Sequence, residues 1–134
     1  MNKKLFLGIV ALIIAVLIIV ILILIPKFSN QNTEDILLKD GMIIPSEKCS
    51  QLEKVITIHG AGCGACAIAI PRLQELEQEL EMEFGYYDLA IDADKERILS
   101  LGLIPEAIPT IIINCKVYVG VRSKEQYKEA ILAE

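Results

Sequence analysis

An uninterrupted apolar run near the N-terminus is the feature that most constrains how this chain can fold. From Leu5 to Ile25 every residue is apolar or glycine, with no charged or hydrogen-bonding side chain. As an α-helix this run would be about 30 Å long, which matches the hydrocarbon core of a bilayer. The remaining domain of roughly 100 residues is too small to bury a helix that is apolar on every side. We therefore expect residues 1–27 to form a transmembrane helix that contacts membrane lipid through residues 5–25.

The flanks of this run bear on whether it is cleaved and on which way it points. It is longer than the apolar core of a cleaved signal peptide, which has about 7–15 residues, and no A-x-A-like cleavage site follows it. Lys3 and Lys4 precede the run, whereas Lys27 alone follows it before the acidic Glu34 and Asp35. By the positive-inside rule, we expect an uncleaved single-pass signal anchor with a cytoplasmic N-terminus and an extracytoplasmic C-terminal domain. An extracytoplasmic domain would lie in an oxidising compartment, where disulfides persist.

The rest of the chain is predicted to form one α/β domain over residues 49–134, after a linker and short N-terminal extension over 28–48. Within that extension, residues 29–33 are polar, and we expect a short helical turn and a strand around 42–44. The chain has a net charge of −5, and its acidic residues are spread along the predicted helices. Both features argue against a nucleic-acid partner.

Hydrophobic patterning predicts the order strand–helix–strand–helix–strand–strand–helix, which is typical of a mixed sheet flanked by helices. Ser123 and Gln126 form a capping box that predicts the start of the last helix. A hairpin turn is predicted at 114–116, and an extra turn around 103–106. The predicted strands are 55–59, 86–91, 110–113 and 117–121, and the other predicted helices run from the cysteine pair to about 84 and from 94 to 101.

Two of the four cysteines, Cys63 and Cys66, stand where a predicted strand gives way to a predicted helix. The first turn of a helix presents unpaired N–H groups and the positive end of the helix dipole. Both favour a thiolate, so the pKa of the Cys63 thiol should fall. We expect Cys63 to be the exposed attacking sulfur and Cys66, one turn further on, to resolve the mixed disulfide. Only the small residues Gly64 and Ala65 separate them.

Further motifs at matching spacing show that residues 53–133 resemble a thioredoxin. Pro71 lies five residues after Cys66, where thioredoxins carry a helix-kinking proline, and the tripeptide 108–110 is the Ile-Pro-Thr of that family. The resemblance implies a thioredoxin-like fold, with a mixed four-stranded sheet flanked by helices. It also implies a cis bond before Pro109, and backbone at Ile108 that pairs with a bound peptide.

The activity implied by this resemblance is that of a thiol–disulfide oxidoreductase, a catalytic class involved in cell redox homeostasis. Its partners would be protein thiols and disulfides, or a membrane electron-transfer partner. The chemistry needs no cofactor beyond the redox-active disulfide of the Cys-x-x-Cys pair, and no metal.

The chain departs from the thioredoxin pattern at two positions near the pair. Gly62 replaces the tryptophan that thioredoxins carry before the first cysteine. Thr57 replaces their buried aspartate and cannot ionise in its place, so proton transfer involving Cys66 should be slower or use water. Because Gly64-Ala65 contains neither the usual proline nor a histidine, we infer that the reduction potential of the cysteine pair is intermediate to reducing.

The remaining candidate residues have open alternatives. His59, the only histidine, could tune the Cys63 thiolate, help to bind a metal, or simply pack beside the site. In the fold that the resemblance implies, the strand before Cys63 runs antiparallel to the strand after Pro109. Cys49 and Cys115 would then come near each other, either as a structural disulfide or as two unrelated thiols.

Two other functions compete with thiol–disulfide exchange. Residues 56–66 also resemble the Gly-Met-x-Cys-x-x-Cys loop of soft-metal binding modules, which hold Cu(I) with thiolates. However, Ala61 stands at the methionine position, and such modules have no partner for the Ile-Pro-Thr tripeptide. A redox-inactive scaffold is disfavoured because both cysteines are present.

Overall fold

The computed structural model describes residues 2–24 and 34–133, which belong to two compact units. The first unit contains helix α1 (Lys3–Leu24), whose 22 residues would be about 33 Å long. Its side chains as far as Ile21 are exposed, and the helix is long and apolar enough to cross a membrane. Ile25 and the predicted linker at 29–33 lie outside the described residues.

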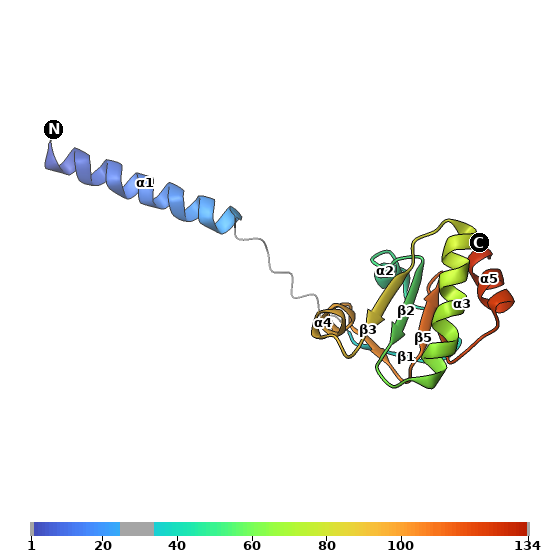
Figure 1. The fold of residues 1–134 in the computed structure, drawn as a ribbon. Helices are drawn as coiled ribbons and strands as arrows, with labels where there is room; N and C mark the ends of the chain where they lie inside the picture. Colours follow the sequence, from blue (N-terminus) through green and yellow to red (C-terminus); the bar gives the residue numbers. More distant parts are fainter. Residues whose placement is uncertain (1, 25–33, 134) are drawn as a thin grey trace. The chain divides into compact units, whose positions relative to one another are not determined.

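The second unit is built on a mixed four-stranded sheet with the strand order β3-β2-β5-β6. Figure 1 shows β3, β2 and β5 side by side. The central strand β2 (Val55–His59) runs parallel to β3 (Gly85–Asp88) and antiparallel to β5 (Thr110–Ile113). The hairpin partner of β5 is β6 (Lys116–Val119). The predicted strands 55–59 and 110–113 are confirmed, and so is the mixed four-stranded sheet.

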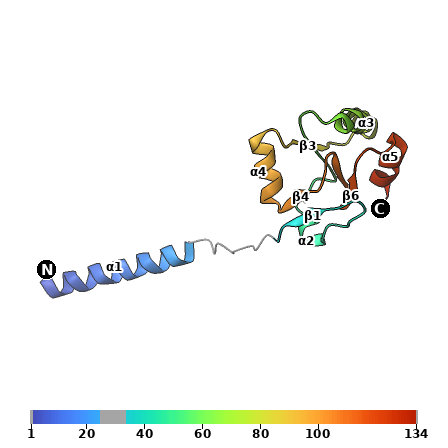
Figure 2. The same ribbon diagram turned by 90° about the horizontal axis from the view of Figure 1, so that it is seen from below.

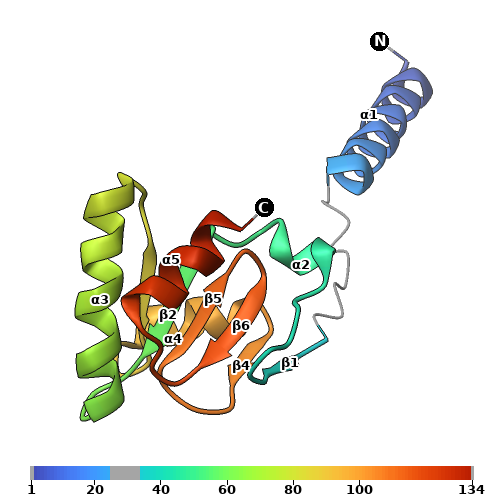
Figure 3. The same ribbon diagram turned by 90° about the vertical axis from the view of Figure 1, so that its right-hand side faces the viewer.

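Helices cover both faces of this sheet (Figures 2 and 3). On one face α3 (Gly64–Leu80) and α5 (Lys124–Leu132) pack over the first core cluster, and the predicted capping box of α5 is present. On the other face α4 (Asp92–Ser100) packs over the second cluster. The first cluster comprises Val55, Leu73, Leu76, Phe84, Ile111, Ile113, Tyr127 and Ile131. The second comprises Leu38, Ile44, Ile56, Ile58, Ile98, Leu101, Leu103, Ile112 and Val117.

The N-terminal extension is part of this folded unit. Strand β1 (Ile36–Leu38) pairs in parallel with β4 (Leu103–Pro105), and Leu38 and Ile44 are buried in the second core cluster. The predicted strand around 42–44 is wrong, because Ile43 makes only an isolated bridge to the sheet. The predicted turn around 103–106 is also wrong, since β4 occupies most of it. A short helix, α2 (Ser46–Cys49), completes the extension.

Several element ends differ from the prediction, and at two of them a side chain accepts a hydrogen bond from the backbone. Helix α3 ends at Leu80 and not near residue 84, since Glu81 is left-handed (φ 50°) and the Phe84 N–H donates to Oε1 of Glu77 at 2.9 Å. Strand β3 ends at Asp88 because the Ala90 N–H donates to Oδ1 of Asp88 at 2.9 Å, which turns the chain toward α4.

Candidate functional site

The Cys63–Cys66 pair lies at the junction between the end of β2 and the start of α3. Cys63 is the N-cap residue of α3, and its Sγ accepts the backbone N–H of Cys66 at 3.1 Å. The Cα atoms of the pair are 5.2 Å apart, and the two sulfurs are at disulfide distance. Cys63 is half-buried, whereas Cys66 is only 3 % exposed. The first turn of α3 therefore presents one accessible and one buried sulfur.

The chain around Cys63 is small and open. Ala61, Gly62 and Gly64 are exposed, and Ala65 is half-buried. Gly62 has φ +70°, a conformation that favours glycine over the tryptophan expected of a thioredoxin. An added Cβ would meet no atom within 4 Å at either Gly62 or Gly64, so no neighbouring group covers the loop at these points.

The Ile108–Pro109 segment lies beside this loop. Ile58 of β2 is paired with Thr110 of β5, so the residues that follow β2 and those that precede β5 share one edge of the sheet. A Cβ added to Gly60 would come within 3.1 Å of Ile108 Cδ1, which shows how closely the two segments approach. Ile108 is half-buried, Pro109 is buried and the bond between them is cis.

Hydrogen bonds hold this segment in place. The Gly120 N–H donates to the Pro109 carbonyl at 2.8 Å. On the other side of the proline, the Thr110 hydroxyl donates to the Ala107 carbonyl at 2.5 Å. One long-range and one local hydrogen bond thus hold the tripeptide beside the cysteine pair.

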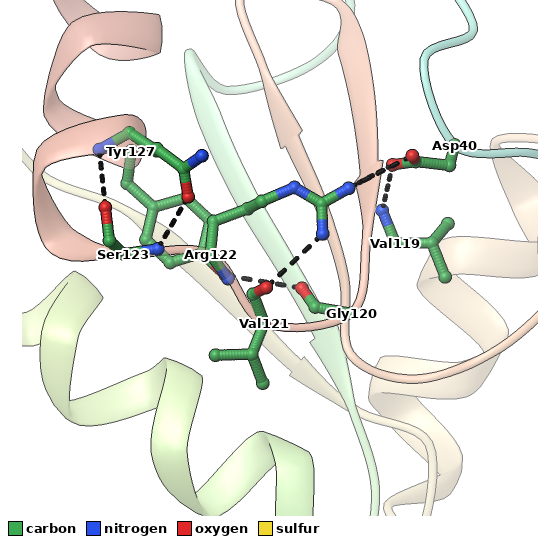
Figure 4. Close-up of polar contacts among 8 residues, drawn as sticks. Asp40, Val119, Gly120, Val121, Arg122, Ser123 and Tyr127 are labelled. Carbon is green, nitrogen blue, oxygen red and sulfur yellow. Dashed lines mark hydrogen bonds and ion pairs between the residues drawn. The ribbon is translucent and has the colours of Figure 1, made fainter.

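A polar network anchors the segment after β6, next to Pro109 (Figure 4). Arg122 Nη2 donates to both carboxylate oxygens of Asp40, at 2.9 and 3.0 Å, and Asp40 Oδ1 also accepts the Val119 N–H at 2.9 Å. The Tyr127 hydroxyl accepts the Arg122 N–H at 3.0 Å. Burial raises the pKa of Tyr127, which keeps its hydroxyl neutral. From the α3 side, Arg72 donates to the Arg122 carbonyl at 2.7 Å.

Sequence reasoning did not single out Asp40 or Arg122. Their 82-residue separation leaves no local pattern that would link them. Only the register of the extension along β6 brings them together.

The other predicted site residues take different positions. Thr57 is fully buried, and its Oγ1 is the one buried side-chain polar atom without a hydrogen-bond partner in the part of the chain described. His59 is half-buried at the end of β2, where its carbonyl accepts the Leu89 N–H at 2.8 Å. Pro71 is exposed within α3. Over residues 2–24 and 34–133, no group of three or more His, Cys, Asp or Glu side chains is placed to hold a metal.

The second cysteine pair lies at the opposite end of β2. Cys49 ends α2 before β2 begins, and Cys115 sits in the β5–β6 turn with φ 65°. Their Cα atoms are 5.6 Å apart, their sulfurs are at bonding distance, and 66 residues separate them in sequence. Both are half-buried and pack against the second core cluster.

Comparison with models of known protein families and with curated proteins found no match to this chain.

Proposed function

We propose that this protein is a membrane-tethered thiol–disulfide oxidoreductase with a thioredoxin-like fold, whose exchanging pair is Cys63 and Cys66. Helix α1 is the anchor, with its N-terminus in the cytoplasm and the folded unit outside. The proposal for the fold is supported by the parallel β2–α3–β3 unit, the antiparallel β5–β6 hairpin and the C-terminal helix, in that order.

The observation that carries the proposal is the hydrogen bond from the Cys66 N–H to Cys63 Sγ at the N-terminus of α3. A sulfur in this position accepts a backbone hydrogen bond and lies at the positive end of the helix dipole. Both interactions stabilise a thiolate more than a thiol, and the thiolate is the nucleophile of disulfide exchange.

The exchange proceeds in two steps. The Cys63 thiolate attacks one sulfur of a substrate disulfide, so that a Cys63–substrate S–S bond forms and the other substrate sulfur leaves as a thiolate. The Cys66 thiolate then attacks Cys63 Sγ, which forms the Cys63–Cys66 bond and releases the second substrate sulfur. Two electrons pass from the pair to the substrate, and the protons lost by the cysteines reach the leaving thiolates through solvent. The same steps in reverse oxidise substrate thiols.

The exposure of Cys63 and of the loop beside it is compatible with a protein substrate. Cys63 is the more exposed cysteine of the pair, the loop beside it is built of glycine and alanine, and Ile108 lies next to that loop. By the resemblance to thioredoxins, the backbone at Ile108 pairs with the substrate chain and directs its disulfide toward Cys63. The proposed partners are therefore proteins carrying exchangeable thiols or disulfides, or alternatively a membrane electron carrier.

A turnover assay on the full chain in detergent micelles tests this function. We expect it to accelerate insulin reduction by dithiothreitol, and we expect Cys63→Ala to abolish that acceleration. Cys66→Ala should accumulate a mixed disulfide at Cys63. The matched control is Cys49→Ala/Cys115→Ala, which removes the other pair and should keep turnover. Tight stoichiometric Cu(I) binding without any cysteine-dependent turnover would overturn the proposal in favour of a soft-metal module.

A further inference from the structure

The hydroxyl of Thr57 stands out because it is buried without a partner. Thr57 and Thr110 are the two buried polar residues identified in the described part of the chain, and both are 0 % exposed. The Thr110 hydroxyl donates to a backbone carbonyl, whereas Oγ1 of Thr57 has no hydrogen bond. A buried polar group without a hydrogen bond costs free energy, so such a group calls for an explanation.

The position of Thr57 points to Cys66. Alternate residues of a strand share one face, so Thr57 faces the same side as Val55, which packs with Leu73 of α3 in the first core cluster. Two strand residues advance about 6.6 Å, and four helix residues about 6 Å, toward the cysteine end. These steps place Thr57 opposite Ala69, which presents only a methyl group. Cys66, which is also buried, lies three residues further along α3 toward the cysteine end.

The redox state of the pair decides whether Cys66 is a good partner for this hydroxyl. In the structure the sulfurs of Cys66 and Cys63 are at disulfide distance, and a disulfide sulfur is a weak acceptor. A dithiol that reduces the pair adds two electrons to the S–S bond and leaves sulfurs that carry a proton or a negative charge. A thiolate is a much stronger acceptor, because hydrogen bonds to charged groups are the strong ones.

We propose that the Thr57 hydroxyl donates a hydrogen bond to the Cys66 thiolate when the pair is reduced, which makes Thr57 a positioning residue for the resolving step. This inference rests on the proposed exchange function of Cys63 and Cys66. A hydroxyl cannot accept the Cys66 proton as a carboxylate would. Instead it stabilises the anion that attacks Cys63.

The hydrogen bond forms only in the reduced state, and this has two consequences. It lowers the pKa of the Cys66 thiol, because it stabilises the charged form. It also stabilises the reduced pair relative to the oxidised pair, which raises the reduction potential. Removing the hydroxyl should therefore raise the pKa of Cys66 and make the pair harder to reduce.

Several ionisable groups lie on the elements around Cys66. They are Cys63 on α3, His59 at the end of β2, Asp88 opposite His59 on β3, and Tyr86, which is opposite Thr57 and bonded to Glu77 of α3. All of them are the same in the parent and in a Thr57 variant. A comparison of the two at equal pH therefore isolates the hydroxyl.

The test measures ionisation of Cys66 in the full chain in detergent, in a Cys63→Ala background, by the ultraviolet absorbance of the thiolate as a function of pH. Thr57→Val should raise the pKa of Cys66, so that at a pH below the pKa the thiolate fraction falls about tenfold, as expected for one charge-assisted hydrogen bond. Thr57→Ala, which lacks the hydroxyl without adding a methyl group, should do the same. Thr57→Ser should keep the parent titration.

Thr110→Val is the matched control, since it removes a buried threonine hydroxyl from the neighbouring strand and should leave the titration of Cys66 unchanged. An unchanged titration in both Thr57→Val and Thr57→Ala, or an equal change in Thr110→Val, would overturn the inference. The readout does not depend on turnover, so loss of insulin reduction in the parent chain would refute the exchange function and leave this test standing.

Discussion

The two cysteine pairs lie at opposite ends of β2 and differ in almost every respect that governs exchange. Cys63 and Cys66 are three residues apart, and the chain beside Cys63 is exposed and rich in glycine. Cys49 and Cys115 are 66 residues apart and pack against the second core cluster. One pair closes a single helical turn, and the other joins the N-terminal extension to the β5–β6 turn.

This difference shows that a disulfide bond can serve either redox exchange or stability, depending on the length of the loop that it closes. A bond across a short loop restricts the unfolded chain little, so it can open and close without disturbing the fold. A bond across a long loop restricts the unfolded chain strongly and contributes to stability. We therefore infer that Cys63–Cys66 exchanges electrons and that Cys49–Cys115 is a structural link.

The largest expected effect separates the pairs by stability. Replacing Cys49 and Cys115 with alanine should lower the free energy of unfolding by roughly 4 kcal/mol, from the entropy of a 66-residue loop. Replacing Cys63 and Cys66 should cost only about 2 kcal/mol by the same relation for a separation of three. Urea unfolding of the oxidised chains measures both, and equal losses would break the comparison.

The next effect concerns the extension that the long-range pair ties down. Leu38→Ala should lower the free energy of unfolding by about 3 kcal/mol, because this side chain is fully buried in the second core cluster. Leu37→Ala is the matched control. Leu37 is the neighbour of Leu38 on β1 but is 45 % exposed, so its replacement should change stability by less than about 0.5 kcal/mol. Similar losses in urea would contradict a packed extension.

A smaller effect is expected at Asp40, which holds the other flank of the extension against β6. Asp40→Asn should cost about 1 kcal/mol, because its carboxylate accepts both the Arg122 guanidinium and the Val119 N–H. Asp35→Asn changes an exposed aspartate in the same extension and serves as the control. Thermal unfolding of the two variants should separate them, and identical curves would rule out a role for the network of Figure 4 in stability.

The smallest effect is a pH dependence between α3 and α5. Hydrogen bonds from Lys128 and then Lys124 lower the pKa of Glu79. A lowered pKa means that this stabilisation is present above the ordinary glutamate value and is lost as pH falls through the folded-state value. Glu79→Gln should thus reduce stability slightly at neutral pH and make no difference in acid. If the denaturation midpoints of the parent and of Glu79→Gln differed by the same amount at acidic and at neutral pH, this account would be contradicted.

Much of the sheet and the position of the cysteine pair could be predicted from local sequence. The strands at 55–59 and 110–113 are short runs rich in β-branched residues, and Ser123 with Gln126 marks the start of α5. By contrast, β1 and β4 have only three residues each and exist because they pair with each other across the chain. The left-handed residue that ends α3 is Glu81 and not a glycine, so the residue type at this position did not predict the end of the helix.

The candidate site divides in the same way. Cys63, Cys66, Ile108 and Pro109 follow from motif and spacing. The close approach of Gly60 to Ile108 and the unpartnered hydroxyl of Thr57 depend on register and on helix packing, which no local pattern encodes.

The most direct measurement of the central claim is the order in which the two disulfides open. The intact chain in detergent is equilibrated in dithiothreitol buffers of decreasing potential, and its free thiols are alkylated and mapped by mass spectrometry. We predict that Cys63–Cys66 opens first, between about −270 and −120 mV, while Cys49–Cys115 stays closed to below about −300 mV. Opening of Cys49–Cys115 first, or of both pairs together, would contradict the assignment of exchange to one pair and structure to the other.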